Sequence, residues 1–229
     1  MKKNQLNHIS FILDGNKRWA KKYNLKNIEG YSKGIDKIYE IIDFCYKKKI
    51  EYVTLFLLST ENINRKNNKS FFNLAKNSFE KFLKNINKIG KIKVNIIGEE
   101  ESLPKDILNL IKKLKNKNNH EYNLTINLAF NYGFDKEINN VISNISNVLI
   151  KKNISIQELN IDDFFYLKNQ PNPDILIRTG GNKRLSNFIL KNLVYTEIYF
   201  IDSLWPDFTL KELENIILNF SNINRNYGL

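Results

Sequence analysis

Apolar and polar positions along this chain form blocks that predict strands and helices in turn. Runs of consecutive apolar, β-favouring residues predict six strands. They lie at residues 8–13, 52–58, 94–97, 124–130, 175–177 and 198–201. Between most of these runs, apolar residues recur at spacings of three and four, which is typical of amphipathic helices. The clearest helical repeats span residues 35–45, 72–86 and 138–148.

The order of these elements predicts the fold class. Strands that are apolar on consecutive positions, rather than on alternate ones, are typical of parallel sheets covered on both faces. We therefore expect an α/β fold with a mainly parallel six-stranded sheet flanked by helices. A chain of 229 residues that is 42% hydrophobic can bury one substantial core, so a single domain over residues 1–229 is expected. Ligands of such sheets bind beyond the carboxyl ends of the strands, which makes the segments after the strands the candidates for a site.

The segment after the first strand, residues 14–19, reads Asp-Gly-Asn-Lys-Arg-Trp and lies where a helix should begin. This is the outline of a diphosphate site. Gly15 permits close approach of the backbone, helix-start N–H groups attract anions, and Arg18 can bind phosphate oxygens with two hydrogen bonds. Asp14 could hold a divalent cation against the same phosphates. The spacing fits equally well a turn in which Asp14 or Asn16 only caps the helix.

Two further strands are followed by polar segments. Residues 59–65 read Ser-Thr-Glu-Asn-Ile-Asn-Arg and, taken alone, fit an ordinary capped loop. Residues 174–187 contain Gly180 and Gly181 between Arg178 and Arg184, followed by Ser186. Paired glycines free the backbone to direct N–H groups at an anion, and the arginines add charge. A plain Gly-Gly turn with surface arginines is the alternative.

Composition narrows the possible functions without choosing among them. A net charge of +12 suits nucleic acid, acidic lipid or phosphorylated small molecules, although a general richness in Lys, Asn and Ile accounts for part of it. The chain has one cysteine, no secretory-type apolar segment and no stretch near the roughly 20 apolar residues that span a bilayer. We therefore expect a cytoplasmic protein whose membrane contact is at most peripheral. The sequence has no phosphate-binding P-loop, no nucleophile elbow and no Cys/His cluster.

Taken together, the three polar segments resemble the signature of the cis-prenyltransferases of the undecaprenyl diphosphate synthase family. The matching motifs are Asp14 to Ala20, Ser59 to Asn62 and Ile177 to Phe188, with further agreement at Asn131-Tyr132-Gly133 and Trp205-Pro206-Asp207-Phe208. The resemblance covers residues 8–228 in order. It implies an Mg²⁺-dependent enzyme that condenses isopentenyl diphosphate with an allylic diphosphate, expected to be farnesyl diphosphate. The product would be a long cis-polyprenyl diphosphate, expected to be undecaprenyl diphosphate, the lipid carrier of cell-wall synthesis.

The resemblance also implies a homodimer, no nucleic-acid partner, and membrane contact only through the lipid product. It assigns roles to individual residues. Asp14 matches a carboxylate that positions Mg²⁺ and assists departure of the allylic diphosphate, Glu197 a second acid associated with Mg²⁺, and Asn62 an asparagine assigned to proton removal. The expected substrate contacts are Gly15, Asn16, Lys17, Arg18, Trp19, Asn27, Tyr31, Ser59, Thr60, Glu61, Ile63, Arg65, Arg178, Arg184, Leu185 and Ser186.

Some positions depart from the family pattern. Asn27 stands where an arginine is usual, Tyr31 where a histidine is usual, Ile63 where a tryptophan is common and Asn182 where a glutamate is frequent. Lys17 replaces the usual glycine and adds a charge that we expect to compensate for Asn27. These departures leave open a catalytically weakened homologue that supports an active partner. A nucleic-acid-binding domain, suggested only by the net charge, is a third hypothesis.

A hydrocarbon product needs an apolar channel. Phe71, Phe72, Phe79 and Phe82 on one predicted helix, with Ile38 and Ile42 on another, are candidates for its lining. Ordinary core packing is an equally good interpretation of the same residues.

Overall fold

The centre of the computed structural model, which describes residues 4–63, 69–101, 103–115 and 121–224, is a six-stranded sheet. The strands are β1 (His8–Ile12), β2 (Tyr52–Ser59), β3 (Ile92–Ile97), β4 (Leu124–Tyr132), β5 (Ile175–Arg178) and β6 (Glu197–Phe200). Their order is β3-β4-β2-β1-β5-β6, and each neighbouring pair is parallel. The six predicted strands and the α/β class are confirmed.

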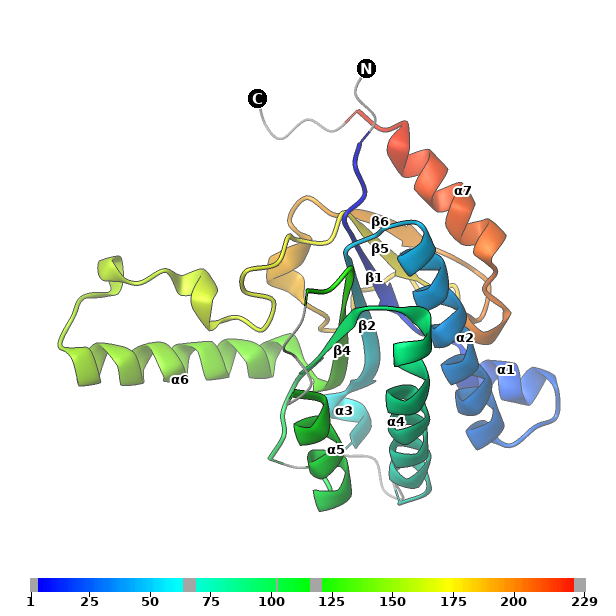
Figure 1. The fold of residues 1–229 in the computed structure, drawn as a ribbon, viewed down its shortest axis with the longest axis horizontal. Helices are drawn as coiled ribbons and strands as arrows, with labels where there is room; N and C mark the ends of the chain where they lie inside the picture. Colours follow the sequence, from blue (N-terminus) through cyan, green and yellow to red (C-terminus); the bar gives the residue numbers. More distant parts are fainter. Residues whose placement is uncertain (1–3, 64–68, 102, 116–120, 225–229) are drawn as a thin grey trace.

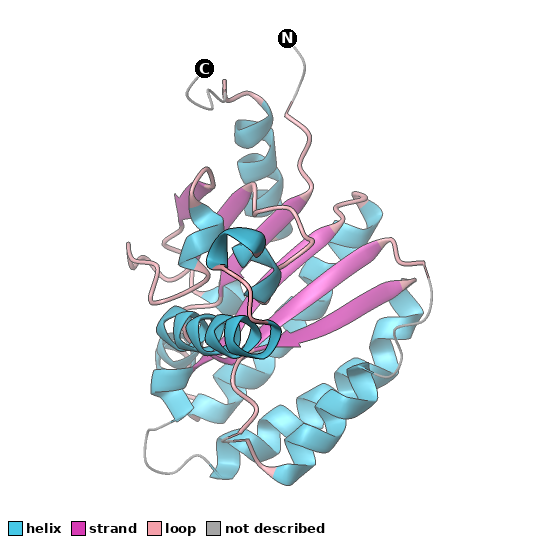
Figure 2. Cartoon of the chain, turned by 90° about the vertical axis from the view of Figure 1, so that its left-hand side faces the viewer, coloured by secondary structure: helices cyan, strands magenta, loops and turns pink. Residues whose placement is uncertain are grey.

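Helices cover both faces of this sheet (Figures 1 and 2). The α-helices are α1 (Asn16–Lys22), α2 (Asn27–Lys47), α3 (Thr60–Ile63), α4 (Lys69–Ile89), α5 (Lys105–Lys115), α6 (Phe134–Lys152) and α7 (Leu210–Ser221). Short 3₁₀ turns span Ile156–Glu158, Ile161–Phe164, Leu190–Leu193 and Trp205–Asp207. Residues of α2, α4, α5 and α7 pack on one face, and α6 with the turns after it lies on the other.

The strand sequences explain why both faces are covered. Successive side chains of a strand point to opposite faces. On β1, Ile9 and Phe11 pack with α2 and α7, whereas Ile12 packs on the other side with Phe56 of β2. All four are buried, so each contributes on the order of 2 kcal/mol through removal of apolar surface from water.

Parallel pairing brings the polar segments to one edge. Ile12 at the end of β1 pairs with Phe56 of β2 and with Arg178 of β5, so three carboxyl ends lie side by side. The segments that follow these strands are the three polar segments of the sequence. Over the part of the chain described here, no helix is both long enough and apolar enough to cross a bilayer.

Candidate active site

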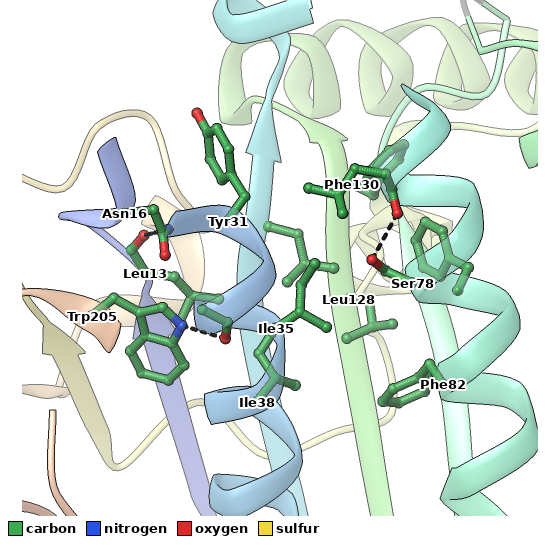
Figure 3. Close-up of a pocket in the computed structure, with 14 residues that line it drawn as sticks. Leu13, Asn16, Tyr31, Ile35, Ile38, Ser78, Phe82, Leu128, Phe130 and Trp205 are labelled. Carbon is green, nitrogen blue, oxygen red and sulfur yellow. Dashed lines mark hydrogen bonds between the residues drawn. The ribbon is translucent and has the colours of Figure 1, made fainter. Parts of the chain in front are cut away.

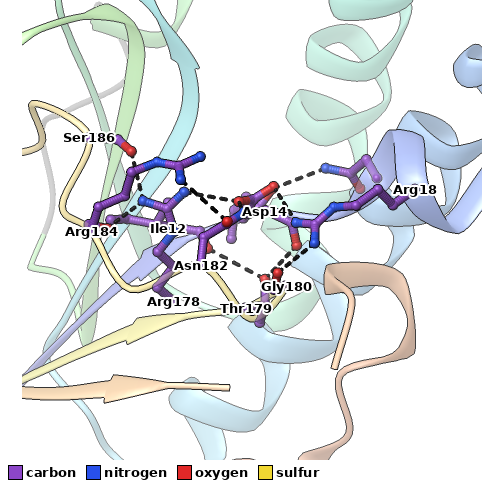
Figure 4. Close-up of polar contacts among 11 residues, drawn as sticks. Ile12, Asp14, Arg18, Arg178, Thr179, Gly180, Asn182, Arg184 and Ser186 are labelled. Carbon is purple, nitrogen blue, oxygen red and sulfur yellow. Dashed lines mark hydrogen bonds and ion pairs between the residues drawn. The ribbon is translucent and has the colours of Figure 1, made fainter. Parts of the chain in front are cut away.

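Asp14 lies just beyond β1 and joins two of the polar loops (Figure 4). Its Oδ1 accepts a hydrogen bond from Arg18 Nη2 at 3.0 Å. Its Oδ2 accepts one from Arg178 Nη2 and one from Asn182 Nδ2, both at 2.9 Å. The carboxylate therefore lies between an arginine of the first loop and an arginine of the loop after β5.

The surroundings of Asp14 favour its ionised form. Partial burial by itself would raise the pKa of Asp14. The hydrogen bonds from Asn182, Arg178 and Arg18 outweigh this effect and hold its pKa below the usual value. The alternative of a helix cap is wrong, because the N-cap of α1 is Gly15 and no side chain caps this helix.

Arg178 is the most enclosed cation of the site, with 3% of its side chain exposed. It ends β5, and its Nη1 donates to Ser186 Oγ at 2.7 Å and to the Arg184 carbonyl. Its Nε is buried without a hydrogen-bond partner among the described residues. Arg178 thus has one buried donor without a partner among the described residues, beside the two nitrogens that it uses for Asp14, Ser186 and the Arg184 carbonyl.

Gly180 allows the two loops to approach. Its φ is +84°, and a Cβ built there would lie 2.5 Å from Arg18 Nη2. Arg18 Nη1 donates to the Gly180 carbonyl at 2.6 Å. A residue with a side chain would therefore be strained in its backbone and would displace the guanidinium. The plain Gly-Gly turn proposed as an alternative does not describe this loop.

The segment after β2 reaches the same loop through Asn187. Asn187 Nδ2 lies 3.3 Å from Glu61 Oε1 and 2.6 Å from Asp135 Oδ1. Partial burial would raise the pKa of Glu61, but hydrogen bonds from Ser59, from the backbone and from Asn187 lower it. Thr60 and the exposed Asn62 lie on α3, which follows β2 directly. Ile63 ends α3, and Arg65 lies outside the described residues.

A cavity of about 730 Å³, counting the space at its open mouth, lies beside these loops between α2, α4 and the sheet (Figure 3). Leu13 and Asn16, on either side of the Asp14-Gly15 pair, line it, as does Tyr31 of α2. Its other lining is almost entirely apolar: Ile35, Ile38, Leu57, Leu74, Phe79, Phe82, Leu128, Phe130 and Trp205, with Gly34 and Ser78. Such a lining suits a hydrocarbon chain.

The structure separates the expected lining residues into two groups. Ile38, Phe79 and Phe82 line the cavity, whereas Ile42 is fully buried in the core. The side chains of Phe71 and Phe72 fall outside the described part of the structure.

Other expected contacts lie at the rim or point elsewhere. Lys17 and Asn27 are exposed on α1 and at the start of α2. Trp19 directs its indole N–H to Asp207 Oδ1 at 2.7 Å, away from Asp14. Arg184 is exposed and its Nη1 lies 3.3 Å from Asn182 Oδ1, while the neighbouring Leu185 packs against the core.

Glu197, the second carboxylate expected to associate with Mg²⁺, lies away from Asp14 within one chain. It pairs with Ile175 at the amino end of β5, whereas Arg178 pairs with Phe200. Glu197 therefore lies three residues, about 10 Å, upstream of the sheet edge that carries Asp14. Within one chain the two carboxylates cannot share an ion.

The remaining donors still suit Mg²⁺. The described residues include no group of three or more His, Cys, Asp or Glu side chains that could hold a metal. Mg²⁺ commonly binds through one or two carboxylates together with substrate phosphates and water. The ionised Asp14 could supply one such oxygen ligand, next to the two arginines Arg18 and Arg178.

Three residues of the site were not among those expected to bind substrate. Asn182 donates to Asp14, Thr179 Oγ1 donates to the Asp14 carbonyl at 2.8 Å, and Asn187 connects the loops after β2 and β5. All three lie within the motif at 177–188, so their position was visible in the sequence. Their partners depend on which strands are neighbours.

Comparisons with known proteins agree with this geometry. A family model for undecaprenyl diphosphate synthases matches residues 12–228. An isoprenyl transferase of Aquifex aeolicus is 36% identical over 223 residues, which is 96% of this chain and 95% of that protein. A tritrans,polycis-undecaprenyl-diphosphate synthase (geranylgeranyl-diphosphate specific) of Pyrococcus horikoshii is 32% identical over 96% of this chain and 86% of its own.

The fold is also shared with a solved structure. Lavandulyl diphosphate synthase from Lavandula x intermedia, in complex with dimethylallyl diphosphate, superposes with a TM-score of 0.87 at 27% identity. The alignment covers 97% of this chain and 98% of that one. With its arginine loops, its apolar cavity and this agreement over nearly its full length, the chain belongs to the undecaprenyl diphosphate synthase family of prenyltransferases.

Proposed function

We propose that this protein condenses isopentenyl diphosphate with an allylic diphosphate, farnesyl diphosphate in the first instance, to make a long cis-polyprenyl diphosphate. The observation that carries the proposal is the position of Asp14. It joins two arginine-bearing loops, and residues beside it line an apolar cavity. Two diphosphates and one growing hydrocarbon chain need such an arrangement.

Each arginine loop has a distinct task in this proposal. Arg18 and the backbone at residues 15–18 hold the allylic diphosphate. Arg178, with its spare buried Nε, and Arg184 hold isopentenyl diphosphate. Because the loops lie against each other at Asp14 and Gly180, both substrates are held with their reacting carbons close together. Such orientation lowers the barrier by removing the entropy cost of bringing two reactants together.

The chemical step separates charge, and the site is built for it. The bond between C1 and oxygen of the allylic diphosphate breaks, and the diphosphate leaves with the electron pair. The double bond of isopentenyl diphosphate then attacks C1, which leaves a tertiary cation beside the new bond. Preorganised N–H groups and guanidinium groups stabilise the departing diphosphate more than the bound substrate. An Mg²⁺ ion held by Asp14 would supply further neutralisation of that charge.

Loss of a proton from the carbon next to the cation completes the step and creates the cis double bond. This carbon is acidic, so a strong base is not needed. Asn62, exposed on α3 at the end of β2, or the released diphosphate serves as the acceptor. Lengthening of the chain then moves its hydrocarbon tail into the cavity between α2 and α4.

The proposal includes undecaprenyl diphosphate as the product, for use as a cell-wall lipid carrier, and a cytoplasmic homodimer as the active form. The name of the Pyrococcus relative supports the product class. The dimer is supported by β6, an edge strand next to the exposed side chains of Val194, at 70%, and Tyr195, at 57%. An open edge with apolar neighbours is typical of a covered interface.

The experiment is a condensation assay. The protein is incubated with farnesyl diphosphate, radiolabelled isopentenyl diphosphate and Mg²⁺, and lipid is extracted and separated by chain length. We expect the parent to give extractable polyprenyl product and Asp14→Ala to lose activity on the order of 100-fold or more. The control is Asp43→Ala, which removes an ion pair with Lys47 far from the site and should keep the activity of the parent.

Two outcomes would overturn the proposal. No lipid product from dimethylallyl, geranyl, farnesyl or geranylgeranyl diphosphate would exclude the condensation. Equal activity of Asp14→Ala and parent would instead favour a homologue that supports an active partner.

A further inference from the structure

The corner formed by α1 and the turn after it combines exposed apolar side chains with clustered cations. Tyr23 and Leu25 are exposed, at 48% and 39%. Residues 19–29, beyond the loop assigned to the substrate, contain Lys21, Lys22 and Lys26 against one carboxylate, Glu29, so eleven residues hold +2 of the net charge of +12. All three lysines are exposed. This density is well above the average for the chain.

The corner is held in place from beneath. The rings of Trp19 and Tyr23 pack with centroids 4.8 Å apart. Asp207 fixes Trp19 through its indole N–H at 2.7 Å and also pairs with Lys22 at 3.2 Å. Lys22 Nζ lies 5.1 Å from the centre of the Tyr23 ring. The contacts with Trp19 and Lys22 thus hold the Tyr23 ring in place while one of its faces stays exposed.

The same corner borders the apolar cavity. Asn16, the first residue of α1, and Tyr31, four residues into α2, both line it. Figure 1 shows α1 projecting from the body beside α2. A surface in contact with a bilayer here would lie next to the opening through which a hydrocarbon product leaves. This step of the argument rests on the proposed function, whereas the charges and exposures do not.

We propose that this corner docks the protein on an anionic lipid bilayer, with Tyr23 and Leu25 inserted among the headgroups and Lys21, Lys22 and Lys26 against lipid phosphates. Tyrosine suits the interface because one end of its ring is apolar and the other is wet. Lysines keep their charge in water while their stems lie along apolar surface. Each lysine near an anionic surface adds roughly fivefold to the affinity.

The observations favour lipid over nucleic acid. A nucleic-acid strand would use the cations and could stack on Tyr23, but it would leave the exposed Leu25 without a partner. An interfacial bilayer region accommodates both side chains.

Vesicle co-sedimentation of the full chain tests this surface. The vesicles contain either phosphatidylcholine alone or phosphatidylcholine with phosphatidylglycerol, at low and at high salt. One variant, Tyr23→Ser/Leu25→Ser, removes the apolar contacts, and a second, Lys21→Glu, reverses one charge. The matched control is Ile150→Ser/Lys151→Glu at the end of α6, where Ile150 is 80% exposed beside lysines.

We expect the parent and the control to bind phosphatidylglycerol vesicles and to release them at high salt. Lys21→Glu should bind roughly 5- to 25-fold more weakly, at about fivefold for each unit of charge. Tyr23→Ser/Leu25→Ser should bind at least fivefold more weakly at the same net charge. Excess inorganic diphosphate should not release the parent, because Lys21, Lys22 and Lys26 are not among the residues assigned to the substrates.

Several results would overturn the inference. The first three are a parent that does not bind vesicles, a control variant that loses as much binding as the others, and release of the parent by inorganic diphosphate. A fourth is that the variants lose binding to an RNA oligonucleotide but keep binding to vesicles. A fifth is a changed oligomeric state of the Tyr23→Ser/Leu25→Ser variant in gel filtration. Circular dichroism confirms that each variant is folded, and Lys21→Glu, on the exposed face of α1, still tests the surface if the double variant is unstable. Condensation activity in detergent is measured alongside. It should be unchanged in all variants, so failure of docking and failure of the proposed reaction are distinguishable.

Discussion

Substitution of Arg178 by lysine should damage the active site more than it destabilises the fold. The Arg178 guanidinium spans three acceptors, which are Asp14 Oδ2 at 2.9 Å, Ser186 Oγ at 2.7 Å and the Arg184 carbonyl. A lysine ammonium keeps the positive charge, but it lacks the planar, two-pronged arrangement of N–H donors of a guanidinium. It can therefore replace only some of these three hydrogen bonds. Hydrogen bonds to charged groups contribute about 1.5–3 kcal/mol each. In the proposed site the diphosphate takes over this fork, so the loss of one or two such bonds to the substrate should lower kcat/KM roughly 100-fold, which is about 3 kcal/mol.

The assay is steady-state condensation with the isopentenyl diphosphate concentration varied at saturating farnesyl diphosphate. The larger change should fall on KM for isopentenyl diphosphate, because Arg178 holds that substrate in the proposed site. The control is Lys183→Ala, an exposed neighbour in the same loop. Thermal unfolding of Arg178→Lys should occur at a moderately lower temperature than in the parent, because the charge opposite Asp14 is retained while the bonds to Ser186 and to the Arg184 carbonyl are lost. A kcat/KM within threefold of the parent would refute the assigned role.

Three further outcomes follow from single contacts. Gly180→Ala should reduce kcat/KM about tenfold or more, because the new Cβ displaces Arg18. In Gly181→Ala, at φ of +73°, the new Cβ would lie 3.3 Å from its nearest neighbour, so this variant should lose only about 1–3 kcal/mol of stability through backbone strain. Equal activities of the two variants would contradict this reasoning. Lys17→Gln should raise KM for the allylic diphosphate several-fold at constant kcat, and unchanged kinetics would exclude compensation for Asn27. Burial lowers the pKa of His8 to about 4, so the unfolded chain binds its proton first as pH falls. Stability should be full above pH 6.5 and decrease by about 2 kcal/mol at pH 5 in urea unfolding, a dependence that His8→Gln should flatten.

The sheet could be predicted because its strands are marked by sequence-local signals. Both faces of the central strands β1, β4 and β5 are buried, and consecutive apolar residues are the direct result. The helix α7 was not among the predictions, although Thr209 and Glu212 form a capping box before an apolar repeat at Leu213, Ile216 and Phe220. That helix was within reach of the same reasoning.

The site was predictable in its residue types but not in its pairings. Polar residues after three strands, and the family motif, indicated where anions would bind. Which side chain meets Asp14 depends on the contact between β1 and β5, whose residues are more than 160 positions apart. For the same reason Asn182 was interpreted only as a departure from the family pattern, whereas it donates directly to Asp14. The distance between Glu197 and Asp14 within one chain was also not visible, because sequence order does not show that Glu197 begins an edge strand.

The contacts of Asp14 also explain how a cluster of arginines can exist before any substrate is bound. Arg178 is almost fully buried, and a buried cation without a partner would destabilise the fold. Asp14 provides the opposite charge from the first loop, so the two arginine-bearing loops are held together by the group that a metal and the substrates share in the proposed function. A diphosphate carries more charge than one carboxylate and accepts more hydrogen bonds, so it can take over the arginines and free Asp14 oxygens. This exchange of Asp14 for a diphosphate as the partner of the arginines leaves both loops in place. The preorganisation of the site and the stability of the empty fold therefore depend on the same ion pairs.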